Sequence, residues 1–365
     1  MDLKKQLPEN IINLKPYVAG KTIGEVVNEF KPGRISKLAS NENRLGCSPL
    51  VKEAVLTSLD EIQDYPDPIS RVLRQKIAEL NGVNEDELLI AAGSESVLSI
   101  LCRVLFNDSD NAITADATFV GFFVQAGVRG IDVVKVPVTD SFEFDAEAII
   151  RSINKNTKAI YLANPNNPTG TYLTKEAYQK LINQVPSDIF LIVDEAYFEY
   201  ARHIADYPHA LDYRKENVIV LRTFSKAYGL AGFRIGYAIA ESSLITQLMK
   251  AKLTFEPTTP AQAAASAAIE DSAFLQKSVD LVEKEKDKLY SFFDENDIKY
   301  VRSASNSVLM VLENEPEAIR ITHEMLKQGV ILRRVNAFGL AHCIRITIGI
   351  PEEMDHFKES LKLIR

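Results

Sequence analysis

The sequence lacks the fingerprints of several large enzyme classes. No Gly-x-Gly-x-x-Gly follows a predicted strand, and neither Gly-x-x-x-x-Gly-Lys-Ser/Thr nor Gly-x-Ser-x-Gly occurs among the 365 residues. Dinucleotide sites, P-loops and the hydrolase nucleophile elbow each depend on one of these patterns. The absences therefore argue against all three kinds of site.

Cysteine is scarce, and positive charge is not in excess. Cys47, Cys102 and Cys343 are widely separated and odd in number, and none has metal-ligand spacing to another cysteine or histidine. A reducing cytoplasm suits such a chain better than an oxidising compartment. The net charge of -8, without a basic stripe, argues against a nucleic-acid surface. We therefore expect no metal and no nucleic-acid partner.

Long hydrophobic runs are also missing. None approaches the length that spans a membrane, and the first ten residues are not followed by the apolar core of a secretory signal. We therefore expect no membrane partner. A hydrophobic fraction of 46% instead indicates a globular protein, and the length allows two domains.

The order of the predicted elements indicates the fold class. Apolar strands alternate with helices from Leu88 to Ala240, which predicts an α/β domain with a mostly parallel sheet covered by helices. Beyond Leu244 the pattern changes to helices and then to a small α+β segment. We predict an N-terminal arm over 1–40, a large domain over 41–255 and a small C-terminal domain over 256–365.

The stretch 223–234 carries the strongest chemical signal. The apolar run 217–221 predicts a buried strand that delivers Lys226 to its carboxyl end, where open α/β sheets bind ligands. A desolvated lysine near another cation can form a Schiff base with an aldehyde. The hydroxyls of Thr223 and Ser225 and the guanidinium of Arg234 suit a phosphate. An aldehyde with a phosphate describes pyridoxal phosphate, although a lysine at a strand end is often only a solvated cap.

Two further strand ends offer partners for such a cofactor. The run 189–193 ends in Asp194, where a buried carboxylate needs a cation or a donor. A protonated pyridine nitrogen would supply one, and a helix cap or a structural salt bridge is the alternative. The strand 158–163 ends in a turn-rich loop around Asn167, which can aim an amide at a ligand.

Two helix starts lie close to other strand ends. Gly93 and Ser94 join a strand to a helix, so backbone amides there can contact a phosphate, although many such turns bind nothing. Phe119 begins another helix, where it can stack on a flat ring or belong to the core.

The predicted small domain contains an arginine inside an apolar strand. Arg345 in 344–349 needs a planar anion, either a substrate carboxylate or phosphate or a carboxylate of the protein. Arg333 and Arg334 end a neighbouring strand, and one of them can join Arg345 while the other is solvated.

Three N-terminal residues have two interpretations each. Tyr17 is an arm aromatic that either packs on the body or reaches a site. Asn43, in a cluster of amides and an acid at 41–43, can order a substrate or cap a turn. Tyr65 lies beside two prolines in a rigid loop and is a recognition residue or plain surface.

Five motifs together resemble the fold type I aminotransferases that depend on pyridoxal phosphate. They are Asn-Asn-Pro-Thr-Gly at 166–170, Asp-Glu-Ala-Tyr at 194–197, Ser-Lys at 225–226, Arg234, and Ile-Arg-Ile-Thr-Ile-Gly at 344–349. Their order and spacing agree over nearly the whole chain, and within the class II group they are most similar to the histidinol-phosphate aminotransferases. The resemblance implies the fold type I architecture, a homodimer and a transaminase of histidine biosynthesis.

The resemblance also implies roles around the cofactor ring. Lys226 would form the Schiff base with the cofactor and move a proton once substrate frees it. Asp194 would pair with the pyridine nitrogen. Asn167 and Tyr197 would hydrogen-bond the ring hydroxyl, and Phe119 would stack on the ring.

Further roles follow for the phosphate and the substrate. The implied phosphate ligands are Gly93, Ser94, Thr223, Ser225 and Arg234, with Tyr65 supplied by the neighbouring subunit. The implied substrate contacts are Tyr17, Asn43, Arg333 and Arg345. The arm over 1–40 would pack on the small domain and on the partner subunit.

Two departures from the family pattern concern the substrate side. Phe119 replaces the usual Tyr, and Arg-Leu-Gly-Cys at 44–47 replaces Pro-Leu-Gly-Pro. Histidinol phosphate has no carboxylate, so Arg345 and Arg333 would bind its phosphate, and they would bind a carboxylate of glutamate or 2-oxoglutarate. They equally suit an aromatic amino-acid aminotransferase or a threonine-phosphate decarboxylase-like enzyme. A regulatory module that only binds the cofactor is the non-enzyme alternative, but no basic helix-turn-helix extension supports it.

Overall fold

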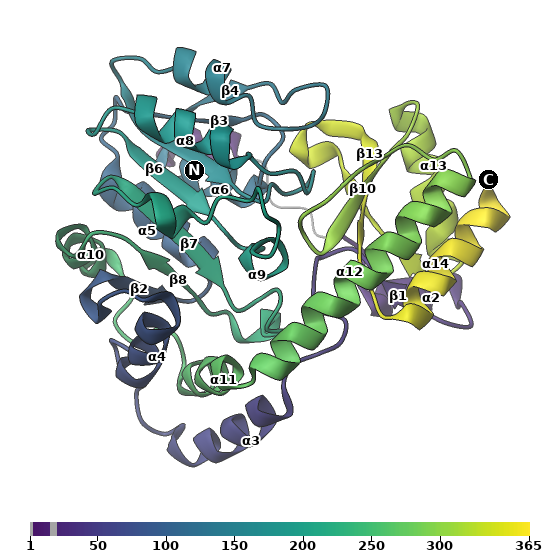
Figure 1. The fold of residues 1–365 in the computed structure, drawn as a ribbon, viewed down its shortest axis with the longest axis horizontal. Coiled ribbons are helices and arrows are strands. Elements are labelled where there is room, and N and C mark those ends of the chain that lie inside the picture. Colours follow the sequence, from purple (N-terminus) through teal and green to yellow (C-terminus); the bar gives the residue numbers. More distant parts are fainter. Residues whose placement is uncertain (1–2, 15–19) are drawn as a thin grey trace.

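A seven-stranded sheet forms the centre of the larger part of the molecule (Figure 1). The computed structural model describes residues 3–14 and 20–365. The strand order is β2-β8-β7-β6-β5-β3-β4, and β8 alone runs antiparallel to its neighbours. In chain order the strands are β2 (Leu88–Ala91), β3 (Asn111–Ala115), β4 (Asp132–Val136), β5 (Thr157–Ala163), β6 (Phe190–Asp194), β7 (Val218–Thr223) and β8 (Gly236–Ile239). The predicted mostly parallel α/β sheet is confirmed.

Helices cover both faces of this sheet, which explains why its strands are apolar runs without strict alternation. In β6, Leu191 and Val193 face one core and Ile192 faces the other. The core of Ile192 includes α5 (Ser94–Leu105), α6 (Val120–Arg129) and α10 (Ser242–Leu248). The opposite core includes α4 (Arg71–Asn81), α7 (Ala146–Arg151) and α8 (Lys175–Gln184).

The smaller part of the molecule is built on an antiparallel sheet of order β12-β13-β10-β9. Its strands are β9 (Tyr300–Val301), β10 (Ser307–Val311), β12 (Arg333–Val335) and β13 (Leu340–Thr347). The long helix α12 (Ser272–Glu295) runs from the large sheet to this one (Figure 1). Helix α14 (Pro351–Ile364) packs on α12, and α13 (Glu315–Lys327) packs on α14 and on β13.

The N-terminal segment contacts both parts. Helix α1 (Glu9–Asn13) packs on α6, where the Asn10 amide donates to the carbonyls of Gly127 and Val128, each at 3.0 Å. Helix α2 (Ile23–Phe30) packs on α13. The N-terminal arm over 1–40 stays a prediction, and the packing of α1 and α2 on other helices is compatible with it.

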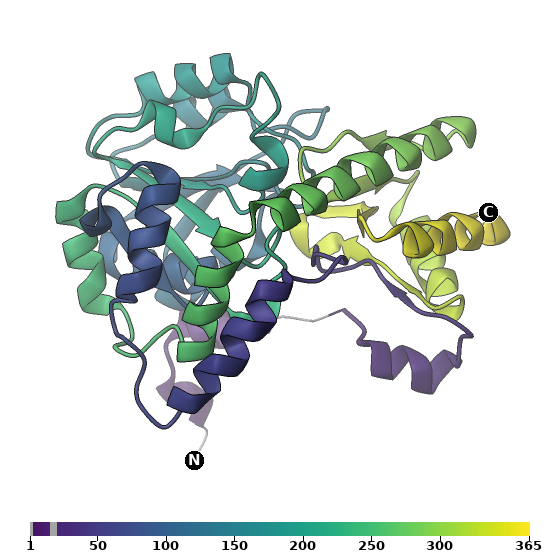
Figure 2. The same cartoon turned by 60° about the horizontal axis from the view of Figure 1, so that its bottom comes forward.

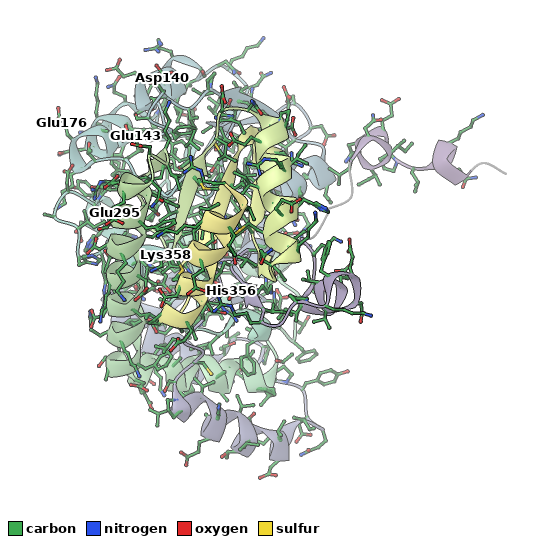
Figure 3. The ribbon with its side chains drawn as sticks, turned by 90° about the vertical axis from the view of Figure 1, so that its right-hand side faces the viewer. Asp140, Glu143, Glu176, Glu295, His356 and Lys358 are labelled. Atoms are coloured by element: carbon green, nitrogen blue, oxygen red, sulfur yellow. The ribbon has the colours of Figure 1, made fainter. Side chains whose placement is uncertain are left out.

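Strand β1 (Ser36–Lys37) joins the N-terminal segment to the small domain by pairing in parallel with β11 (Val330–Ile331). His356 of α14 reinforces this junction (Figure 3). Its Nδ1 lies 2.9 Å from the Ser36 hydroxyl, and its Nε2 lies 2.8 Å from the Gln328 carbonyl. Since a carbonyl only accepts, Nε2 donates there and Nδ1 accepts from Ser36.

Helices α3 (Pro49–Ser58) and α11 (Thr259–Glu270) lie side by side under the large sheet (Figure 2). The division at residues 40 and 255 stays a prediction, and the packing of α11 on α3 and α4 favours a boundary inside α12. The remaining helices are α9 (Phe198–Ala201) and the 3₁₀ turns at Leu3–Gln6, Leu59–Glu61, Glu85–Glu87, Ala210–Tyr213, Ala231–Phe233, Met249–Ala251 and Asn336–Phe338. Within 3–14 and 20–365, no helix has the length and apolarity to cross a membrane.

Candidate active site

A cavity opens at the carboxyl ends of β5, β6 and β7. It continues into a wider hollow that extends to β12 and β13 of the small domain. We call the two together the cleft. Residues that line both parts are Glu95, Phe119, Asn167, Tyr197 and Lys226.

Asp194 ends β6 as a buried carboxylate with only 3% of its surface exposed. Its Oδ2 accepts from the Tyr161 hydroxyl at 2.8 Å, and its Oδ1 accepts from the Ala196 amide at 3.1 Å. Both donors are uncharged, and burial raises the pKa of Asp194 to about 6. A ligand with a cationic N–H would relieve that cost of burial.

Lys226 follows β7 and reaches the same cavity. Its Nζ lies 3.4 Å from the Ser40 carbonyl and 5.7 Å from the centre of the Tyr197 ring. Burial lowers the pKa of the Lys226 amine to about 8, and the positive charges of Arg345 and Arg234 act in the same direction. The amine is therefore prepared to attack a carbonyl carbon near neutral pH.

A group of donors forms an anion pocket at the start of α5. The first amides of a helix have no partner inside it, so the Ser94 and Glu95 amides are left for a ligand. Gly93 has a φ of 92°, and a Cβ there would lie 2.9 Å from Nη2 of Arg234. Glycine thus allows the guanidinium to lie against the turn.

Two hydroxyls complete the anion pocket. The Thr223 hydroxyl donates to Ser225 Oγ at 3.0 Å and accepts from the Ser225 amide at 3.1 Å. Nη1 of Arg234 lies 3.5 Å from the same Ser225 oxygen. The structure therefore brings together the five residues that sequence assigned to a phosphate.

Asn167 links the large domain to the small one. Its Oδ1 accepts from Arg345 Nη1 at 2.5 Å, and Arg345 Nη2 donates to the Ala39 carbonyl at 2.7 Å. Arg345 is 5% exposed but lines the wider hollow. The anion that the sequence predicted for Arg345 remains a prediction, and the position of Arg345 on the wider hollow would allow a ligand there to reach it.

Arg333 and Arg334 point to opposite faces of β12, as neighbours in a strand do. Arg333 lines the wider hollow and is the register partner of Arg345 on β13. Arg334 instead donates to Glu315 at 2.6 Å. Of the two arginines, Arg333 therefore lies where a ligand in the cleft could reach it, and its substrate contact stays a prediction.

Phe119 and Tyr197 supply the aromatic surfaces of the cleft. Phe119 precedes α6 and lies over Gly121, where a Cβ would be 2.5 Å from its ring. Tyr197 is 3% exposed, and its hydroxyl accepts from the Asn41 amide at 2.9 Å. Both rings lie where a flat ligand held by Asp194 would meet them.

Two described residues with predicted site roles lie outside the lining of the cleft, and a third lies outside the described residues. Asn43 is not among the lining residues, and its amide donates to the Ala227 carbonyl at 2.8 Å and to Ser278 at 2.9 Å, so its substrate contact stays a prediction. Tyr65 is 79% exposed on the outside and stacks on Phe255 at 4.2 Å. Tyr17 lies outside the described residues.

Sequence reasoning missed Tyr161, Asn41 and Glu95. Tyr161 lies inside an apolar strand, where an aromatic residue reads as core, and its ring does stack on Phe122 at 4.3 Å. Asn41 and Asn43 lie two residues apart in the same amide-rich stretch, and no local pattern shows which of them contacts the active site. Glu95 follows the Gly93-Ser94 turn, and its position in the first helical turn was the available signal.

An amine of lowered pKa, a buried carboxylate and an anion pocket at the strand ends of this sheet define an enzyme that acts on carbonyl and amino groups. The sequence matches the family of class I and II aminotransferases over residues 34–361. The chain therefore belongs to this family and is an aminotransferase, as the resemblance predicted.

Individual relatives agree with this assignment. The chain is 39% identical to a histidinol-phosphate aminotransferase of Geobacillus sp. (strain WCH70), over 99% of this chain and 97% of that protein. It is 40% identical to histidinol-phosphate aminotransferase 1 of Bacillus cereus, over 98% and 96%. A solved histidinol-phosphate aminotransferase from Sinorhizobium meliloti, in complex with pyridoxal-5'-phosphate, superposes with a TM-score of 0.90 at 26% identity and covers 99% of this chain and 98% of its own.

The contact between Tyr161 and Asp194 gives a direct prediction. Tyr161→Phe keeps the ring that stacks on Phe122 but removes a donor that holds the pKa of Asp194 down. We expect the Asp194 pKa to rise above about 6 in the cofactor-free protein, measured by ¹³C NMR titration of labelled aspartate.

Tyr178→Phe is the matched control, because the buried Tyr178 hydroxyl has no hydrogen-bond partner within the described residues. It should leave the titration of Asp194 unchanged. An unaltered Asp194 titration in Tyr161→Phe would contradict the claim that the Tyr161 hydroxyl holds the pKa of Asp194 down.

Proposed function

We propose that the protein transfers the amino group between L-histidinol phosphate and 2-oxoglutarate, giving imidazole-acetol phosphate and L-glutamate, with pyridoxal phosphate as cofactor. The observation that carries the proposal is the pair of arginines, Arg333 and Arg345, that faces the cleft from adjacent strands. The names of the relatives at 39% and 40% identity support the same substrate. The reaction belongs to histidine biosynthesis.

The residues present fit the cofactor. Asp194 offers a carboxylate to the pyridine nitrogen. Burial destabilises the ionised form of that carboxylate and raises its pKa, and a cationic ring nitrogen would stabilise the ionised form. The anion pocket of Ser94, Ser225 and Arg234 suits the phosphate. Phe119 would cover one face of the ring. When bound, pyridoxal phosphate withdraws electrons from the substrate carbon.

The chain's own residues supply proton transfer and orientation. We assign to Lys226 Nζ the proton that moves between the substrate carbon and its acceptor, because the pKa of this amine is lowered to about 8 and the carboxylate of Asp194 is assigned to the ring nitrogen. Tyr197 and Asn167 would orient the ring oxygen of the cofactor, Tyr197 through its hydroxyl and Asn167 through its amide. The contact of Asn167 with Arg345 ties this orientation to the substrate side.

The two arginines present like charges to the same hollow, which suits a doubly charged anion. Arg333 and Arg345 are register partners on β12 and β13. A doubly charged phosphate could accept from both guanidinium groups. A carboxylate of glutamate or 2-oxoglutarate would use the same pair in the other half of the reaction.

We also propose that the working unit is a homodimer in the cytoplasm. Large apolar side chains are exposed on α3, on α4, in the segment between them and in the loop before α11, which suits a protein interface. They are Leu50, Leu56, Leu59, Ile62, Tyr65, Val72, Leu253 and Phe255. Tyr65 would reach the phosphate of the partner's cofactor. The free cysteines Cys47, Cys102 and Cys343 suit a reducing compartment.

Turnover with competing amines tests the proposal. Purified protein with bound cofactor should form glutamate from histidinol phosphate and 2-oxoglutarate with a higher kcat/KM than from phenylalanine. Threonine phosphate should not be decarboxylated. Preference for phenylalanine would indicate an aromatic amino-acid aminotransferase, and bound cofactor without any turnover would indicate a regulatory module.

Neighbouring arginines provide a matched pair of variants. Arg333→Gln removes one charged donor to the phosphate and should raise the KM for histidinol phosphate roughly 10- to 100-fold, with a smaller change in kcat. Arg334→Gln changes the next residue, which points to Glu315, and should leave that KM unchanged. Steady-state kinetics measures both variants. An equal rise of KM in the two would contradict the proposal that Arg333 binds the substrate phosphate.

The lowered pKa of Lys226 predicts how cofactor capture depends on pH. Only the neutral amine attacks the aldehyde, so the neutral fraction, and with it the rate, rises with pH up to the pKa and then levels off. With a pKa of about 8 instead of 10.5, the capture rate of cofactor-free protein should level off near pH 8. Stopped-flow absorbance measures this rate.

Arg345→Gln should move that midpoint upward, because the positive charge of Arg345 helps to lower the Lys226 pKa. Arg334→Gln should leave it in place. A rate that still climbs toward pH 10 in the unaltered protein would contradict the prediction.

A further inference from the structure

The segment 39–41 contacts a different residue of the active site with each of its three residues. The carbonyl of the first accepts from Arg345 at 2.7 Å, and the carbonyl of the second faces Lys226 at 3.4 Å. The side chain of the third, Asn41, donates to the Tyr197 hydroxyl at 2.9 Å. This segment belongs to no strand of the large sheet, so the register of the sheet does not account for its contacts with the active site.

Asn41 is held more firmly than a surface loop residue. It is 1% exposed and has a φ of 54°, a left-handed conformation that asparagine tolerates better than most residues. Thr347 of β13 accepts from its backbone amide at 2.9 Å and donates to its Oδ1 at 3.0 Å. Ser307 of β10 accepts from its Nδ2 at 3.1 Å.

These contacts fix which way the amide points. The Thr347 oxygen already accepts from the Asn41 backbone, so its own proton is available for Oδ1. Nδ2 is then directed at Tyr197 and Ser307. Because an amide nitrogen only donates, the Tyr197 oxygen accepts from it, and the proton of that hydroxyl must point elsewhere. Tyr197 lines the cleft, so the cleft is the open direction.

We propose that Asn41 is a positioning residue of the reaction, which directs the Tyr197 hydroxyl proton into the cleft and ties that hydroxyl to the two small-domain strands β10 and β13. Since Arg345 lies two residues before Thr347 on β13, the strand that binds the substrate anion also holds the amide that orients Tyr197. The inference rests on the proposed function only in that Tyr197 donates to the bound cofactor.

The pH midpoint of the absorbance change of bound cofactor tests this arrangement. Asn41→Gly removes the side chain, and glycine accepts the left-handed backbone without strain. A hydroxyl proton donated to the ring oxygen stabilises the deprotonated form of the cofactor, so its misdirection should raise the midpoint by about one pH unit. We also expect kcat to fall about tenfold, with KM for histidinol phosphate little changed.

A double-mutant comparison separates positioning from general damage. With Tyr197→Phe as background, Asn41→Gly should produce no additional shift of the midpoint. Ser307→Ala removes another partner of the same amide without touching Tyr197 and should leave the midpoint in place. An unchanged midpoint in Asn41→Gly, or an equal shift in the Tyr197→Phe background, would overturn the inference.

A measurement without cofactor keeps this inference separate from the proposed function. The Asn41 amide lowers the pKa of the Tyr197 hydroxyl against the raising effect of burial. In cofactor-free protein labelled with ¹³C-tyrosine, Asn41→Gly should therefore raise the pKa of the Tyr197 resonance, which Tyr197→Phe identifies by its loss. An unshifted Tyr197 titration would overturn the inference whichever substrate the enzyme prefers.

Discussion

The parallel register of β5, β6 and β7 is the constraint on which the active site depends. Ala163 pairs with Asp194, and Asp194 pairs with Leu221, so the three strands end at one edge. The loops that carry Asn167 and Lys226 therefore leave the sheet beside the carboxylate. A register slip of one residue would turn Asp194 to the opposite face of the sheet. The helices on both faces bury these strands and keep water from relieving the charge of Asp194.

The second half of the site comes from the small domain. The arginines of β12 and β13 offer positive charge to a ligand, while the strand ends of the large sheet offer the amine and the carboxylate. Hydrogen bonds join the halves from Arg345 to Asn167 and from Thr347 to Asn41, whose amide donates to Tyr197. The relative position of the active-site residues therefore depends on how the two sheets are held together.

The sequence predicted the parts of this site that follow long apolar runs. Asp194 and Lys226 stand at the ends of such runs, and strand ends in an α/β sheet meet at one edge. Contacts decided by side-chain direction were not predictable. Strand alternation selects Arg333 over Arg334, and a left-handed φ at Asn41 presents that residue, and not Asn43, to Tyr197. Long-range pairing of β1 with β11 likewise leaves no local pattern in the sequence.

The most direct test of this account is a crystal structure of the protein with its cofactor and histidinol phosphate. The account predicts that the substrate phosphate lies between the guanidinium groups of Arg333 and Arg345, with the substrate amino group at the Lys226 end of the cleft. A substrate phosphate bound away from both arginines would contradict the claim that the small domain binds the substrate anion while the large domain supplies Lys226 and Asp194.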